Sequence, residues 1–248
     1  VYVDGAGAIA DKEAHGWTEF LINLHVYLHV PGTLGLTIVG ALGVMMTALT
    51  IGGVLAHPRI FRDAFRLRAR GQRQLALADW HNRLGVWTLP FGLALALTGA
   101  MIGLAGVGFW AVANQWYAGD MEKAYAPIFG GEPAHAEGAA PLARIDRAMA
   151  NLTATHPDVQ PSYVILHEPG TRGQYLTILA KHPRRLIYGE TYAFDAAGRP
   201  THKVGLSDGP VGQQFAASTY DLHFGSFGGW PVRIVYVLLG AAVTVICG

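Results

Sequence analysis

The sequence has few charged residues and a single cysteine. Lysine, arginine, aspartate and glutamate make up 14% of its 248 residues, whereas a typical soluble domain has about a quarter. No charged residue occurs between Phe20 and Pro58, or between Leu84 and Gly119. The lone Cys247 excludes an intrachain disulfide framework and a cysteine-rich metal site. These absences indicate a membrane protein.

Common catalytic motifs are also absent. The sequence contains no GxSxG nucleophile elbow, no HExxH zinc motif and no glycine-rich phosphate loop. Its apolar stretches hold no pair of carboxylates suited to acid–base catalysis. A net charge of +1 gives no argument for nucleic-acid binding. The sequence therefore gives no support to a hydrolytic function.

Three apolar stretches are long enough to cross a bilayer, whose hydrocarbon core needs roughly 20 helical residues. We predict spans over residues 32–56, residues 83–108 and from about Trp230 onward. Before the first span, residues 17–30 carry Trp and Tyr, which favour the membrane–water interface. Pro31 predicts a kink or a new helix start at that point.

The distribution of arginine predicts the orientation in the membrane. The loop 57–80 has six arginines and two aspartates, a net charge of +4, which favours the cytoplasm. Residues 17–108 then form an interfacial segment, two spans and this loop, preceded by an extramembrane tail, 1–16. Residues 109–222 carry nine basic and eleven acidic residues and are expected outside. The last span falls within 223–248.

The segment 109–222 is predicted to be a small α+β domain. Residues 141–156 have Leu142, Ile145, Met149 and Leu152 at helical spacing. Short strands are expected at 162–166, 175–180, 188–194 and 201–204, separated by turns such as Pro169-Gly170. The predicted fold class is a membrane α-helical protein with three transmembrane helices and one extramembrane α+β domain.

Histidines gather at two levels of the predicted spans. His25, His29 and His223 lie on the outer side, and His57 and His81 on the inner side. Ionisable residues at membrane helices are costly and usually functional, and two imidazoles from different helices can ligate one haem. His25 and His29 are four residues apart and are expected to share a helix face. Either could then ligate with His223, while the other contacts a haem propionate or the substrate.

A plainer interpretation is that each histidine is simply a wet polar ring at the interface. For a single histidine that interpretation is preferable, but five histidines at two levels favour haem. The other histidines of the 109–222 segment lie on predicted turns or strands without metal-like spacing, and we expect surface or structural roles for them: His135, His156, His167, His182 and His202.

Four motifs, in this order, resemble those of the PepSY-associated transmembrane family. They lie at residues 24–31, 57–63, 79–91 and 222–225, and their histidines are the five named above. The resemblance covers roughly residues 20–248, with the α+β segment matching the PepSY domain. It implies a bacterial inner-membrane protein, and some members are haem-b reductases that take iron from ferric siderophores. The family also has a further first helix with a histidine, so we interpret this chain as part of a longer protein.

The resemblance and the histidines together lead to one expectation and one alternative. We expect a membrane electron-transfer protein with one or two haems b, reducing ferric iron or a ferric siderophore for iron uptake. The electron donor would be a quinol or a reductase. The haem iron would be bound through His25, His29, His81 and His223, with His57 a further cofactor contact; His81 would pair with His57 or with the family's additional histidine. The alternative is a non-catalytic membrane subunit, or a partner-binding PepSY module of a larger respiratory or transport complex.

Overall fold

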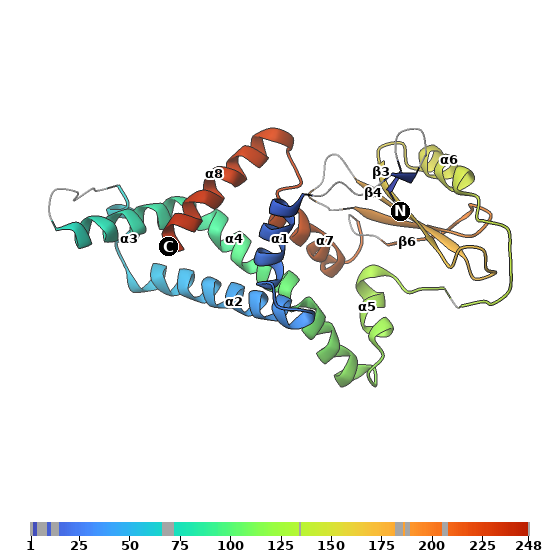
Figure 1. The fold of residues 1–248 in the computed structure, drawn as a ribbon, viewed down its shortest axis with the longest axis horizontal. Helices are drawn as coiled ribbons and strands as arrows, with labels where there is room; N and C mark the ends of the chain where they lie inside the picture. The colour runs from blue at the N-terminus through green and yellow to red at the C-terminus, as the bar shows by residue number, and fades with distance from the viewer. Residues whose placement is uncertain are drawn as a thin grey trace.

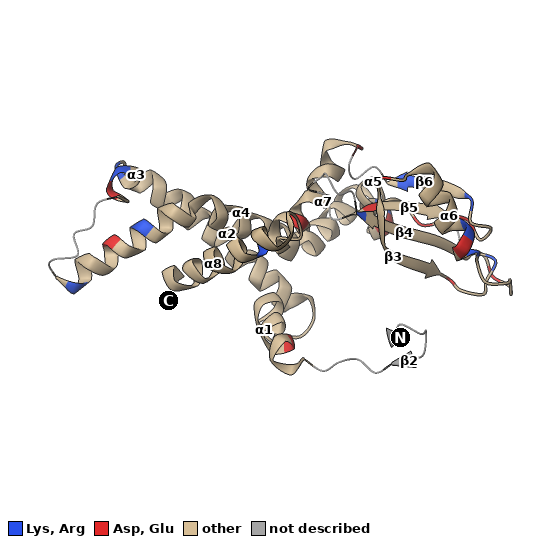
Figure 2. Cartoon of the chain, turned by 90° about the horizontal axis from the view of Figure 1, so that it is seen from above, with Lys and Arg blue, Asp and Glu red and all other residues tan. Residues whose placement is uncertain are grey.

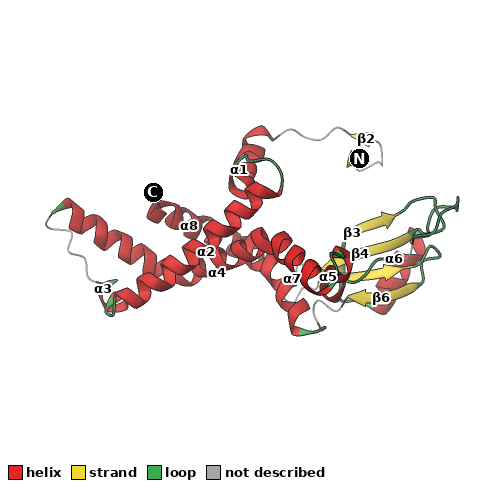
Figure 3. Cartoon of the chain, turned by 90° about the horizontal axis from the view of Figure 1, so that it is seen from below, coloured by secondary structure: helices red, strands yellow, loops and turns green. Residues whose placement is uncertain are grey.

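The computed structural model describes residues 2–3, 9–10, 15–65, 72–133, 135–181, 186, 189–204 and 208–247. Long helices form one end of an elongated molecule, and a small sheet with one covering helix forms the other end (Figure 1). Figure 3 shows the same division, with all strands of the sheet at the end away from α3. The described N-terminal residues include two short paired strands, β1 (Tyr2–Val3) and β2 (Ile9–Ala10).

Three helices are long and apolar enough to cross a membrane: α2 (Thr33–Ala56), α4 (Arg73–Trp116) and α8 (Gly229–Cys247). Most charged residues lie near α3 or on the sheet module, and the helical middle is nearly free of them (Figure 2). The predicted fold class is confirmed: a mostly helical membrane protein with a small antiparallel sheet. The three helices also expose much apolar surface, so this chain contacts the lipid bilayer.

A short helix, α1 (Gly16–Tyr27), precedes the first span and carries the aromatic residues of the predicted interfacial segment. The chain then turns before α2, so a new helix begins after Pro31. Leu28 and His29 both adopt left-handed backbone conformations, with φ of 52° and 55°. His29 therefore lies outside α1, and the prediction that His25 and His29 share a helix face is wrong. Helical spacing relates two residues only while the helix continues between them.

Close glycine contacts join α2 to α4. A Cβ added at Gly103 would lie 2.6 Å from the Gly40 Cα, and one added at Gly43 would lie 2.9 Å from the Ala100 nitrogen. The two backbones can approach this closely because Gly40 and Gly103 carry no side chain and Ala100, opposite Gly43, has only a methyl group. Gly103 thus packs against α2, whereas Gly99, four residues earlier on α4, faces a different helix.

The helices around the spans differ from the predicted boundaries. α4 continues to Trp116, eight residues beyond the predicted end of its span. The last span, α8, begins at Gly229 and is preceded by a separate helix, α7 (Val211–Phe224), which packs against α4. Two shorter helices complete this part, α3 (Ile60–Asp63) in the basic loop and α5 (Met121–Phe129) after α4.

The sheet module is a four-stranded antiparallel meander with one helix on it. The strands run in the order β3 (Gln160–His167), β4 (Tyr175–Lys181), β5 (Glu190–Phe194) and β6 (Pro200–Val204). Helix α6 (Ile145–Thr155) covers one face and buries Leu152 against Leu176 and Ile178. Leu142 lies before this helix and is exposed, so its predicted place on the apolar face is wrong. The expected α+β character of the segment is observed.

Candidate functional site

The structure brings His25 of α1 close to His223 of α7. Their ring centres are 6.1 Å apart and their planes are inclined by 25°. The two residues are almost 200 positions apart in sequence, and they meet because α1 and α7 both lie beside the spans. His25 is exposed and His223 is half-buried, so the ring on α7 is the more firmly held of the two.

The imidazole of His223 packs against helix α4. A Cβ added at Gly99 would lie 3.0 Å from the His223 Cε1 atom, so the missing side chain leaves room for the imidazole. The Thr98 hydroxyl lies 3.1 Å from His223 Nδ1. At the end of α7, Gly225 is left-handed with φ 61°, and the Tyr236 hydroxyl of α8 donates to the Leu222 carbonyl at 2.6 Å. Helices α4 and α8 together fix the segment that carries His223.

The hydrogen bonds of Thr98 determine which nitrogen of His223 is protonated. A threonine hydroxyl has one proton to donate. That hydroxyl lies 2.7 Å from the Ala94 carbonyl oxygen, which can only accept, so the hydroxyl proton is donated to that carbonyl. The oxygen of Thr98 then accepts a hydrogen bond from Nδ1–H of His223. This leaves Nε2 unprotonated, with the lone pair that a metal requires.

The histidine pair lies deeper in the helical part than the sequence suggested. Gly99 is fifteen residues after Leu84 in the uncharged stretch that ends at Gly119, about 22 Å along the helix at about 1.5 Å per residue. This is closer to the middle of that stretch than to its outer end. The sequence places His25 and His223 at the outer entrance of the spans, because His223 shortly precedes the predicted last span, which begins near Trp230. Instead, α7 carries His223 down along α4.

His29 is not part of this pair. It lies in the turn after α1, packs against Phe20 with ring centres 4.7 Å apart, and lines a groove between α1 and α2. Of the two alternatives at the outer level, the structure therefore brings His25, and not His29, to His223.

The two inner histidines are not brought together. His57 follows the last residue of α2, and its Nε2 lies 3.7 Å from a carboxylate oxygen of Asp63. His81 is exposed on α4. No ring contact between His57 and His81 occurs in the described part of the chain. Of the two pairings considered for His81, the one with His57 is therefore not formed.

Thr98 and Arg83 were not predicted as site residues. Threonine is common in membrane helices, so nothing in the sequence marked Thr98 as the partner of a histidine 125 positions later. Arg83 lies two residues after His81 and is 8% exposed, and its Nε and Nη2 atoms have no hydrogen-bond partner. Its position inside the 79–91 motif was the only signal for it.

The sheet module shows no second cluster of metal ligands. Among the described residues, no group of three or more His, Cys, Asp or Glu side chains could hold a metal ion. His135 contacts Glu168, whose carboxylate raises the pKa of the imidazole above its usual value. His167 stacks on Tyr175, and His156 lies against Tyr192. These contacts agree with structural roles; His182 lies outside the described residues.

The fold and the histidine pair define a multi-pass membrane protein with an extramembrane α+β module. A family model described as the PepSY-associated TM region matches residues 1–248. The chain belongs to this family. It is also similar to an uncharacterized protein of Pseudomonas aeruginosa, with 37% identity over 128 residues. That match covers 52% of this chain and 32% of the relative, so the chain spans about a third of the relative's length.

Proposed function

We propose that this chain is a haem-b electron-transfer protein of the bacterial inner membrane that reduces ferric iron or a ferric siderophore. The observation that carries the proposal is the pairing of His25 with His223 between helices of the membrane part. A pair of imidazoles from separate helices is the arrangement required for bis-histidine haem ligation.

The spacing of the pair is compatible with one metal ion between the rings. Metal–imidazole bonds are about 2.0–2.1 Å long, and each ring centre is about 1 Å from its nitrogen, which gives a total of about 6 Å. The ring centres of His25 and His223 are 6.1 Å apart. The donor set also fits, because Thr98 leaves Nε2 of His223 unprotonated. His25 and His223 would therefore hold the iron.

The residues of this chain would bind and position the haem. When bound, a haem supplies reversible one-electron chemistry between ferric and ferrous iron. His25 and His223 would hold the iron, and a site with two imidazole ligands would favour electron transfer over binding of a further ligand to the iron. Thr98 fixes the orientation of the His223 ring, and Gly99, which has no side chain, leaves room for that ring. His81, with Arg83 two residues later, is the candidate for an inner haem site. Its second histidine would be the additional one of the family's further helix.

The sheet module is proposed to lie in the periplasm, where the ferric chelate arrives. The six arginines of loop 57–80 support this orientation, because short basic loops remain in the cytoplasm. Electrons from the inner side or from a quinol would then leave towards the outer side through the His25–His223 site.

An optical spectrum of the purified protein tests the proposal. We expect a Soret band, a reducible α-band and a pyridine-haem count of one or two haems per chain. A colourless protein that stays colourless after haem is added would contradict the proposal. That result would instead favour the non-catalytic membrane subunit.

A further inference from the structure

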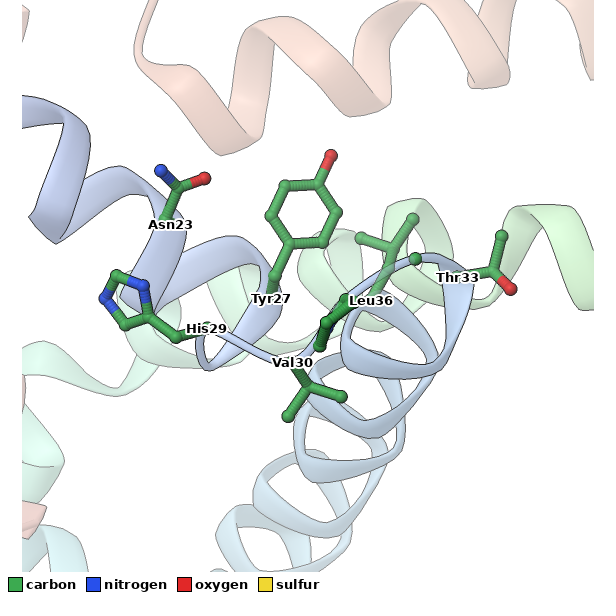
Figure 4. A pocket seen from close by; sticks show the side chains of 8 residues that line it. Asn23, Tyr27, His29, Val30, Thr33 and Leu36 are labelled. Carbon is green, nitrogen blue, oxygen red and sulfur yellow. The ribbon is translucent and has the colours of Figure 1, made fainter.

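A groove lies at the corner between α1 and α2, beside the turn that joins them (Figure 4). Its volume is about 530 Å³, within the range of about 300–1,000 Å³ that is usual for small-molecule sites. Its lining comes from the end of α1, the turn and the start of α2: Asn23, Tyr27, His29, Val30, Pro31, Gly32, Thr33 and Leu36.

The lining favours a neutral ligand with an apolar body and polar atoms. No lysine, arginine, aspartate or glutamate lines the groove. An anionic chelate, a haem propionate or a lipid phosphate would therefore find no cation there. Asn23, Tyr27 and His29 supply polar atoms, and the hydrogen bonds found among the described residues include none from their side chains. These three side chains remain available to a ligand.

The backbone holds His29 at the edge of the groove. Leu28 and His29 are consecutive non-glycine residues with positive φ, a conformation that is uncommon and is often retained at ligand-binding sites. The turn is secured by hydrogen bonds from the His29 nitrogen to the Asn23 carbonyl at 3.3 Å and from the Val30 nitrogen to the Tyr27 carbonyl at 2.9 Å. In Figure 4 Asn23 and His29 lie side by side at one side of the groove.

We propose that this groove binds a lipid-soluble quinol, which is the electron donor. The inference rests on the proposed haem function, because His25 belongs to the same last turn of α1 as Asn23 and Tyr27. A quinol is neutral, reaches the site through the bilayer, and carries two hydroxyl groups on an apolar ring. Its oxidation to the quinone breaks two O–H bonds and releases two protons and two electrons. His29 would accept one proton and water the other, and the two electrons would reduce two ferric ions of the substrate, one at a time, by way of the haem that His25 and His223 would hold.

Equilibrium binding of a decyl-benzoquinone to the full chain in phosphatidylcholine nanodiscs tests the site. Thr33→Trp fills the groove, whereas Leu34→Trp adds the same side chain at an exposed neighbour that does not line it. We expect Thr33→Trp to weaken quinone binding at least tenfold and Leu34→Trp to leave it unchanged. His29→Ala should weaken binding about fivefold, as loss of one hydrogen bond does. Equal affinity in the wild type, Thr33→Trp and His29→Ala would overturn the proposal.

A second measurement separates this inference from the proposed function. In haem-loaded protein, Thr33→Trp should abolish reduction by a quinol and leave the Soret band and reduction by dithionite unchanged. Haem-loaded wild type that binds no quinone overturns the groove proposal alone. A chain that binds quinone in the groove but never binds haem overturns the proposed function alone.

Discussion

Thr98 is the residue that most directly connects the packing of the helices with the chemistry of the site. It lies on a membrane helix, its hydroxyl donates a hydrogen bond to the Ala94 carbonyl of that helix, and its oxygen accepts a hydrogen bond from Nδ1–H of His223. A hydroxyl in this position acts on a metal only through the histidine. Its contribution is therefore measured as a change in haem binding and haem spectrum, and not as loss of the site.

Thr98→Val removes the acceptor and keeps the shape of the side chain. We expect haem affinity to fall roughly 10–100-fold, as for other partners that orient a ligating histidine. The matched control is Thr88→Val, which removes a buried hydroxyl that donates to the Leu84 carbonyl on the same helix; in the described part of the chain this hydroxyl has no hydrogen bond to an imidazole. Haem titrations of both variants measure the effect. Equal affinities for the two variants would contradict the role given to Thr98.

His135 offers a test in the sheet module, far from the histidine pair. The hydrogen bond and charge of Glu168 raise the pKa of His135 above its usual value, about 6.5. A raised pKa in the folded state means that this contact stabilises the module fully below the ordinary pKa and ceases to do so as the pH rises through the raised value. An NMR titration should show the His135 pKa falling in Glu168→Gln. Glu132→Gln, which removes a weaker charge effect, should lower it less. Identical titrations in both variants would disprove the pairing.

At the scale of secondary-structure elements, the α2–α4 contact rests on glycines that admit no side chain. A Cβ added at Gly40 would lie 2.8 Å from the Gly103 backbone, whereas one added at Gly52 of the same helix meets nothing within 4 Å. We expect Gly40→Ala to destabilise the membrane part by about 1–3 kcal/mol through overpacking. Gly52→Ala should stabilise it by up to about 1 kcal/mol, because alanine favours a helix over glycine.

Thermal unfolding of both glycine variants in the same detergent measures this difference in sign. If both substitutions shift the midpoint in the same direction and by the same amount, the close approach of α2 and α4 at Gly40 is not present in solution.

The sequence predicted those elements whose local pattern also determines their packing. The uncharged stretch after Pro31 predicted α2, and alternating apolar residues predicted β4, because burial follows directly from such patterns. Helix α7 was not predicted, since its mixed polar and apolar residues give no clear period until α4 is placed beside it. The left-handed turn at Leu28 and His29 was not predicted either, because neither residue is a glycine and such turns usually contain one.

The candidate site was predicted only in part, for the same physical reason. The sequence supplied the histidines and an orientation for each span. It could not choose between His25 and His29, because that choice depends on where α1 ends. It also could not reveal Thr98 as a partner of His223, because the contact joins residues 125 positions apart. Contacts between distant elements depend on tertiary packing, which local patterns do not encode.

At the scale of the whole molecule, the proposed orientation across the membrane rests on the arginines of loop 57–80. In a Cys247→Ser background, which removes the only cysteine, a cysteine is introduced at Arg73 or at Ala136. Both positions are exposed. We expect an impermeant thiol reagent added to intact spheroplasts to label position 136 and not position 73, and detergent to make both reactive. Labelling of 73 but not 136 in intact spheroplasts would reverse the proposed orientation.

The proposed function depends on the pairing of His25, before the first span, with His223, before the last span. In the described chain these two are the histidines whose rings lie near each other between membrane-associated helices. If a haem is held there, electrons can cross from the groove between α1 and α2 or from the inner side to the sheet module. If no haem is held there, the proposed electron transfer has no carrier between the donor and the sheet module.

Electron paramagnetic resonance of haem-loaded His25→Ala, His223→Ala and His29→Ala, each made singly, tests this pairing most directly. Removing an axial imidazole converts six-coordinate low-spin iron to high spin or empties the site. We therefore predict that His25→Ala and His223→Ala lose one low-spin signal, with lower haem content, and that His29→Ala keeps it. Wild-type low-spin signals and haem content in both His25→Ala and His223→Ala would contradict the central claim.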